Sequence, residues 1–167
     1  MELLIVRHGV AYERDTQRWP DDGERPLSPR GVIRGRRAAA GLKRVTPQPA
    51  RVLTSPLTRA RQTAEILSQF AGWPAATSTP LLLPEASPAA LLALLARTRA
   101  AECVAVVGHQ PHLGRLLAAC LPGKSASDAF ELRKLGVALV AFRGAARAAH
   151  GKLVWLAPPR LLRAARR

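Results

Sequence analysis

Three adjacent residues near the start of the sequence, Arg7, His8 and Gly9, combine side chains suited to phosphate chemistry. Arginine offers a planar fork of donors that matches phosphate oxygens, and a neutral imidazole can act as nucleophile, base or metal ligand. The triplet follows the apolar residues 3–6, which predict a buried strand. Because ligands of open α/β sheets bind beyond the carboxyl ends of strands, we expect Arg7 and His8 at a ligand-binding edge of a sheet.

Two further segments place polar residues directly after an apolar run. Residues 55–65 read Ser-Pro-Leu-Thr-Arg-Ala-Arg-Gln-Thr-Ala-Glu, and residues 107–111 read Val-Gly-His-Gln-Pro. The Ser-Pro pair predicts a helix start, with the serine as N-cap. Arg59 is then expected in the first helical turn, where backbone N–H groups and the helix dipole favour anions. His109 is expected to face His8 across neighbouring strand ends.

Taken in order, these motifs resemble the histidine phosphatase superfamily, which has an Arg-His-Gly triplet on its first strand, a Ser-Pro-x-x-Arg-Ala-x-Gln-Thr-Ala segment and a late Gly-His. The short chain, the Arg-Pro-Leu-Ser stretch at residues 25–28 and the Gly-His-x-Pro form of the late motif most resemble SixA-type phosphohistidine phosphatases. The resemblance extends over residues 2–156. It implies hydrolysis of a phosphoryl group through a covalent phosphohistidine, without a metal or other cofactor.

By residue matching, the resemblance makes His8 the nucleophile and implies that Arg7, Arg59 and His109 bind the phosphoryl group. Arg25, from the Arg-Pro-Leu-Ser stretch, matches a further phosphate-binding arginine of the SixA-type pattern. Neighbouring cations disfavour protonation of an imidazole, so we expect His8 to keep a free lone pair near neutral pH.

The proton donor for the leaving group is the open assignment. Phosphoglycerate mutase relatives carry a glutamate in inserted helices that this chain lacks, and only Glu85 and Glu102 lie in the corresponding interval. Glu85 is the better placed of the two; the alternative is a solvated loop carboxylate. Phosphohistidine needs less help from an acid, because its imidazole leaving group can be protonated before the bond breaks.

These considerations favour a phosphatase that acts on phosphohistidine in a signalling protein. Two alternatives stay open: a small-molecule phosphomonoesterase of the same superfamily, and an inactive basic module that binds phosphate or nucleic acid. A metal site is a weaker hypothesis. His109 and His112 have a spacing seen in zinc sites, but Pro111 interrupts it and no third ligand stands at a fixed offset. We therefore expect no metal, and we expect His112 and His150 at the surface or beside the site.

The sequence is strongly basic, with 26 Lys and Arg against 11 Asp and Glu in 167 residues, a net charge of +15. Basic patches bind nucleic acids by releasing counterions, but these arginines are spread along the chain. We interpret them as a soluble surface that steers anionic substrates, with no dedicated nucleic-acid site. No signal peptide or run of membrane-spanning length is evident, which predicts a cytoplasmic protein that does not contact a membrane. Cys103 and Cys120 are expected to be buried free thiols.

The order of strand and helix signals predicts an α/β fold, a three-layer sandwich with a mostly parallel central sheet, helices on both faces and a C-terminal antiparallel edge hairpin. We expect one domain over residues 1–167, with a turn-rich loop over the site at residues 10–27. The tail, residues 160–167, is expected to form a short basic helix or a frayed terminus. Other expected elements are helices from Ser-Pro pairs at 28–29, 55–56 and 87–88, a helix over 111–121, strands at 51–54, 81–83 and 103–107, and a hairpin of 136–142 with 152–156.

Overall fold

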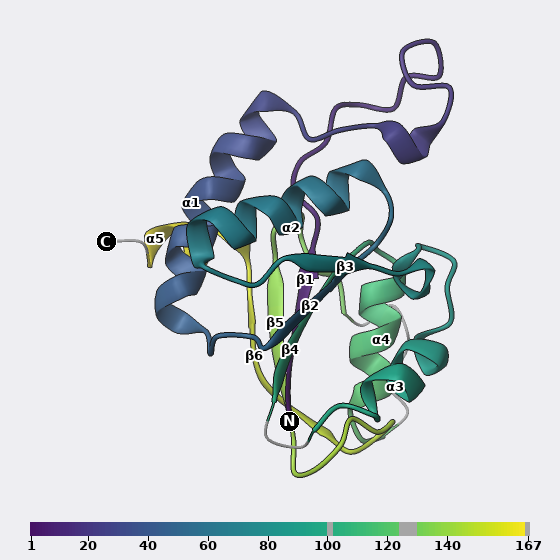
Figure 1. Ribbon diagram of the computed structural model, residues 1–167, viewed down its shortest axis with the longest axis vertical. Coiled ribbons are helices and arrows are strands. Elements are labelled where there is room, and N and C mark those ends of the chain that lie inside the picture. The colour runs from purple at the N-terminus through teal and green to yellow at the C-terminus, as the bar shows by residue number, and fades with distance from the viewer. Residues whose placement is uncertain (100–101, 124–129, 166–167) are drawn as a thin grey trace.

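A computed structural model describes residues 1–99, 102–123 and 130–165. Its centre is a six-stranded sheet with the order β3-β2-β4-β1-β5-β6 (Figure 1). The first four strands along the chain are parallel, whereas β5 is antiparallel to both β1 and β6. This arrangement confirms the predicted, mostly parallel sheet with an antiparallel pair at one edge. The strands are β1 (Glu2–Arg7), β2 (Arg51–Thr54), β3 (Ala76–Ser78), β4 (Cys103–Gly108), β5 (Val137–Phe142) and β6 (Gly151–Ala157).

Helices cover both faces of the sheet, as the three-layer prediction requires (Figure 1). The helices α1 (Pro29–Val45), α2 (Thr58–Ala71) and α5 (Pro159–Ala164) lie on one side, and α3 (Pro88–Leu95) and α4 (His112–Cys120) on the other. Successive side chains of a strand point to opposite faces. In β1, Leu3 and Ile5 therefore join the hydrophobic core beneath α3 and α4, while Leu4 and Val6 join the core beneath α1 and α2.

The first helix begins where the Ser-Pro signal predicts. The hydroxyl of Ser28 accepts a hydrogen bond from the Gly31 N–H at 3.1 Å, and the fixed φ of Pro29 suits the first helical position. Gly31 also allows a close approach, since a Cβ at this position would lie 1.9 Å from the carbonyl oxygen of Val10. The segment that leaves β1 is thus held directly against the first turn of α1.

Two local predictions are wrong, and each has a physical reason. The residues predicted as a strand at 81–83 instead belong largely to a 3-10 turn, Pro80–Leu82, and the edge strand lies earlier, at β3. Thr79 caps this turn through a hydrogen bond from the Leu81 N–H, and Leu82 is fully buried. The helix expected after the Ser-Pro pair at 55–56 begins only at Thr58, without a side-chain cap.

The basic tail is ordered as a helix through α5 rather than frayed. Leu162 is 2% exposed and belongs to the same hydrophobic core as α1 and α2, which holds the helix against the body of the protein. Residues 166–167 lie outside the described part of the chain. None of the described helices combines the length and the hydrophobicity that crossing a bilayer requires.

Candidate active site

The two motif histidines meet at the carboxyl ends of neighbouring parallel strands. Arg7 at the end of β1 is in register with Gly108 at the end of β4, so that the next residue of each strand, His8 and His109, emerges at the same edge. The His8 N–H donates to the Gly108 carbonyl at 3.0 Å, and the centroids of the two rings are 4.8 Å apart. Both side chains are buried, and the strand pairing fixes their juxtaposition.

The backbone selects one tautomer of His8. Its Nδ1 lies 2.7 Å from the carbonyl oxygen of Gly9, and because a carbonyl can only accept, Nδ1 carries the proton. The lone pair then resides on Nε2. A second set of bonds ties this turn to α2, because the Gly9 N–H donates to Thr63 Oγ1 at 3.0 Å and the Thr63 hydroxyl donates to the Arg59 carbonyl at 2.7 Å. His8 therefore presents a nucleophilic nitrogen in a fixed orientation.

Burial and nearby cations keep His8 neutral. Together they lower its pKa from 6.5 to about 3: burial has the largest effect, and the positive charges of Arg59, Arg7 and Lys134 act in the same direction. The hydrogen bond to Gly9 opposes this shift only in part. The sequence predicted that neighbouring cations keep His8 neutral, but burial of the ring away from water lowers its pKa more than they do.

Ser55 orients the second histidine. Its hydroxyl lies 2.8 Å from Nε2 of His109, and its oxygen accepts a longer hydrogen bond, 3.4 Å, from the Leu57 N–H. We infer that the hydroxyl of Ser55 donates its proton to Nε2 of His109, which makes Nδ1 the protonated nitrogen of that ring. That Nδ1 is buried and has no hydrogen-bond partner. The use of this hydroxyl by His109 also explains why Ser55 does not cap α2.

Arg59 lies in the first turn of α2, where the sequence places it, and is only 5% exposed. Its Nη1 donates to the Asp22 carbonyl oxygen at 2.8 Å and lies 3.3 Å from the Asp22 carboxylate. Arg25 binds the same carboxylate through Nε at 2.8 Å and donates from Nη1 to the Tyr12 carbonyl at 2.7 Å. The hydrogen bond from Arg25 is the main reason why the pKa of Asp22 is lowered.

Asp22 was not predicted as a site residue. It belongs to a short 3-10 helix, Asp22–Glu24, within the turn-rich loop between β1 and α1. One more aspartate in a polar loop carries no sequence signal, since its position depends on two arginines that it meets only after folding. The structure therefore brings Arg25 and Arg59 together around an internal carboxylate.

Arg7 contributes a second buried donor without a partner. Its Nη1 donates to the Leu132 carbonyl at 2.6 Å and lies 4.0 Å from the exposed Glu131 carboxylate, but its Nε is buried and makes no hydrogen bond. Buried polar groups in native proteins nearly always have partners. Two unpaired donors, Arg7 Nε and His109 Nδ1, thus accompany the nucleophilic nitrogen of His8.

Comparisons with known proteins show which family the chain resembles. The Histidine phosphatase superfamily (branch 1) matches the chain over residues 3–82. The phosphohistidine phosphatase SixA of Escherichia coli is 30% identical over 131 residues, which cover 75% of this chain and 77% of that protein. The chain belongs to the histidine phosphatase superfamily. This member of the superfamily is also 39% identical over 139 residues to an uncharacterized protein of Picosynechococcus sp., with 82% of each chain covered.

The fold places the chain among SixA-like members of the superfamily. The structure of the protein histidine phosphatase SixA complexed with tungstate superposes with a TM-score of 0.80 at 29% sequence identity. The match covers 97% of this chain and 99% of that one. The similarity therefore includes the C-terminal hairpin and helix, which lie beyond the residues that the family comparison matches.

In this SixA-like protein, Glu85 acts on the charge state of His112 rather than of His8, and both buried ring nitrogens of His112 are without a hydrogen-bond partner among the described residues. Glu85 is exposed in the turn before α3, and the charges that shift the pKa of His8 do not include it. Its charge acts instead on His112, whose pKa burial lowers and Glu85 raises. His112 is fully buried rather than at the surface. Across the described ranges, no set of three His, Cys, Asp or Glu side chains is arranged to hold a metal ion.

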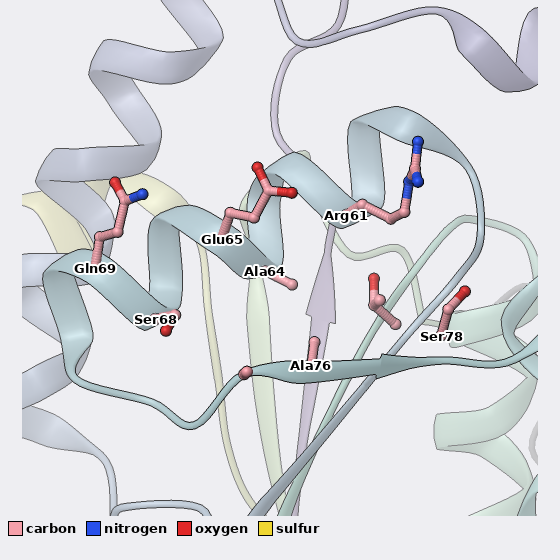
Figure 2. A pocket seen from close by; sticks show the side chains of 9 residues that line it. Arg61, Ala64, Glu65, Ser68, Gln69, Ala76 and Ser78 are labelled. Atoms are coloured by element: carbon pink, nitrogen blue, oxygen red, sulfur yellow. The ribbon is translucent and has the colours of Figure 1, made fainter.

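A hollow of about 280 Å³ between α2 and β3 lies apart from these residues (Figure 2). Arg61, Glu65 and Ser68 of α2 line it together with Ala76 and Ser78, and none of the predicted site residues takes part. The two arginines of the Arg-Ala-Arg sequence therefore differ in environment, with the first buried beside Asp22 and the second exposed.

Proposed function

We propose that this SixA-like protein is a phosphohistidine phosphatase that acts on a histidine-phosphorylated signalling protein. The observation that carries the proposal is the pair of buried, unpaired donors, Arg7 Nε and His109 Nδ1, at the strand edge that also holds the lone pair of His8. A phosphoryl group between them would supply the missing acceptors and offer phosphorus to the nucleophile. Arg59 would add a third donor by exchanging Asp22 for a phosphate oxygen.

In the first chemical step, Nε2 of His8 attacks phosphorus in line, and the bond between phosphorus and the substrate's imidazole nitrogen breaks. The leaving imidazole keeps the bonding electron pair, and it departs as a neutral ring because it was protonated beforehand. Charge spreads over the three equatorial oxygens in the transition state, where fixed donors stabilise it most. Arg7, Arg59 and His109 supply those donors.

In the second step, water attacks the phosphorus of phosphorylated His8, and the phosphorus–nitrogen bond breaks. The electron pair returns to Nε2. One proton of the water stays on the released phosphate and the other passes to the imidazole of His8. That proton then leaves to solvent, because the pKa of His8 is about 3 in the free site.

The available carboxylates favour a phosphohistidine substrate over a phosphate ester. Asp22 is bound by arginines that hold its pKa low, so it is a poor proton donor. Glu85 exerts its charge on His112 rather than on His8. An alcohol leaving group needs protonation by the enzyme, whereas an imidazole needs less. We assign the activity to the cytoplasm, in line with two buried free thiols, Cys103 and Cys120.

The experiment is to trap the intermediate. A histidine-phosphorylated protein with labelled phosphate is mixed with the phosphatase and quenched, and the label on the enzyme is tested for stability. We expect an acid-labile, alkali-stable adduct that His8→Ala abolishes and His150→Ala, a change at an exposed histidine, retains. Acid-stable label would indicate a serine ester and refute the mechanism. Far higher catalytic efficiency on sugar phosphates would replace this proposal with a small-molecule phosphatase.

A further inference from the structure

A basic groove of about 580 Å³ opens beside the candidate active site. Its walls come from the start of α1, the segment before β5 and the helix α5, and it includes Arg7 from the site itself. Val10, Leu135 and the Pro158-Pro159 pair give it an apolar lining. Its cationic side chains are Arg7, Arg34, Arg133, Lys134, Arg160 and Arg163.

The positive charge of the groove is largely uncompensated. Glu131 is the single carboxylate among the lining residues, and its side chain is 80% exposed. Among the described residues, Arg7 is the only one of the six cations that forms an ion pair, at 4.0 Å. Arg34 has Arg30 and Arg163 as neighbours, and after burial these two are the causes that lower its pKa. Like charges that lie close together repel one another, so the clustering of these cations in the groove is unfavourable until an anion binds.

Packing holds the tail in this position. Leu162 is buried in the core beneath α1, and it lies between Arg160 and Arg163 in the sequence of α5. The two arginines are three residues apart on a helix and both line the groove, as neighbours at this spacing share a face. A hydrophobic anchor therefore fixes two cations that a frayed terminus would leave in solvent.

We propose that this groove binds an acidic segment of the protein substrate, next to the phosphohistidine that enters the active site. The inference rests on the proposed function and names the chemistry of the partner. Continuity supports it, because Arg7 lines the groove and also lies beside His8 at the end of β1. Carboxylates on the partner would neutralise the cations, and the apolar lining would contact its side-chain stems.

A protein segment fits the groove better than a nucleic acid does. Nucleic-acid sites follow the phosphate backbone as a long basic stripe, often with aromatic side chains on which bases stack. The apolar lining of this groove is formed by aliphatic residues and prolines, with no aromatic residue among the lining side chains. Such a surface suits a folded partner or an extended peptide with several carboxylates.

The test compares two peptides that carry the same phosphohistidine, one flanked by Asp and Glu and the other by Asn and Gln. We expect the phosphatase to hydrolyse the acidic peptide with about tenfold higher kcat/KM at low salt, and salt to remove the preference. The double change Arg160→Glu with Arg163→Glu should abolish the preference while activity on the neutral peptide stays within about twofold. That unchanged activity also shows that the variant is folded, and Arg160→Gln with Arg163→Gln should give an intermediate result.

The matched control is Arg143→Glu with Arg147→Glu, which changes the net charge equally. Both residues are exposed and follow β5, at the end of the sheet where the Met1 ammonium donates to the Phe142 carbonyl, opposite to His8. This control should keep the preference for the acidic peptide. Equal loss in both double variants would show a general charge effect and overturn the groove assignment.

The two proposals fail in different ways. If the wild-type protein hydrolyses both peptides equally and the α5 variant behaves alike, the groove inference is wrong and the proposed function stands. If it hydrolyses neither, the proposed function fails, and fluorescence anisotropy with the unphosphorylated acidic peptide then decides the groove by whether the α5 variant loses binding. Tight binding of single-stranded DNA at physiological salt, lost in the α5 variant, with no peptide preference, would assign the groove to nucleic acid.

Discussion

Replacing Ser55 by alanine should impair the reaction although the serine is not a nucleophile in this mechanism. Its hydroxyl lies 2.8 Å from Nε2 of His109, and both side chains are buried. Without this hydroxyl, no donor faces Nε2 of His109. The proton of the neutral ring is then free to move from Nδ1 to Nε2. His109 would then present a lone pair rather than a donor to the phosphoryl group.

The Ser55→Ala change should lower both the folding free energy and kcat. Loss of one buried partner leaves the imidazole nitrogen unsatisfied, which costs about 1–3 kcal/mol of folding free energy. In a chain of this size, each kcal/mol lowers Tm by roughly 2–4 °C. Loss of one donor from a preorganised anion site lowers kcat by about 10²–10³-fold. Because Ser55→Ala redistributes the tautomers without removing the ring, we expect a smaller decrease, of about 10- to 100-fold.

The assay combines turnover of a phosphohistidine substrate with nitrogen NMR of the His109 ring, which reports the protonated nitrogen directly. Ser87→Ala is the matched control, since Ser87 also precedes a proline and a helix but makes no side-chain cap bond. It should change neither readout. The tautomer argument is refuted if Ser55→Ala leaves Nδ1 of His109 protonated, or if it shifts the proton to Nε2 without lowering kcat.

Three further outcomes are expected. Arg59→Ala should lower vanadate affinity and kcat/KM by at least about tenfold, because a buried charged hydrogen bond is lost. The control Arg61→Ala should change both quantities by less than about twofold. A reversed result would show that the motif is read in the wrong register. The wild-type free energy of unfolding, measured in urea, should fall from pH 6.5 toward pH 3, because His8 binds a proton in the unfolded chain but stays neutral in the folded protein, where its pKa is about 3. This group contributes a slope of at most about 1.4 kcal/mol per pH unit. His8→Ala should reduce that slope. Glu85→Gln should lower turnover of phosphohistidine protein by less than about threefold, and a far larger loss would identify Glu85 as the acid.

Signals that depend on neighbouring residues predicted the scaffold well. The Ser-Pro pairs marked the starts of α1 and α3, and the apolar, valine-rich run of residues 103–107 marked the central strand β4. The meeting of His8 and His109 also followed from sequence, because parallel neighbouring strands end at the same edge.

Contacts between segments that are distant in the sequence could not be predicted from such local signals. Ser55 has the local signature of a cap, but His109, fifty-four residues away, takes its hydroxyl. Asp22 contacts Arg59 from a loop, and no hydrophobic periodicity in the sequence predicts the path of that loop. The proposed role of Arg160 and Arg163 depends on the burial of Leu162. The sequence of a short basic tail does not predict that burial.

The reacting group and the surroundings of the substrate belong to parts of the fold with different freedom to change. His8 is fixed by the pairing of β1 with β4, and a single-residue insertion in β1 would turn its side chain to the opposite face of the sheet. The loop between β1 and α1 and the helix α5 are not bound by that register. If the proposed function holds, descendants of this sequence can therefore exchange one phosphorylated partner for another by altering those segments, while they keep the same proposed phosphoryl-transfer step.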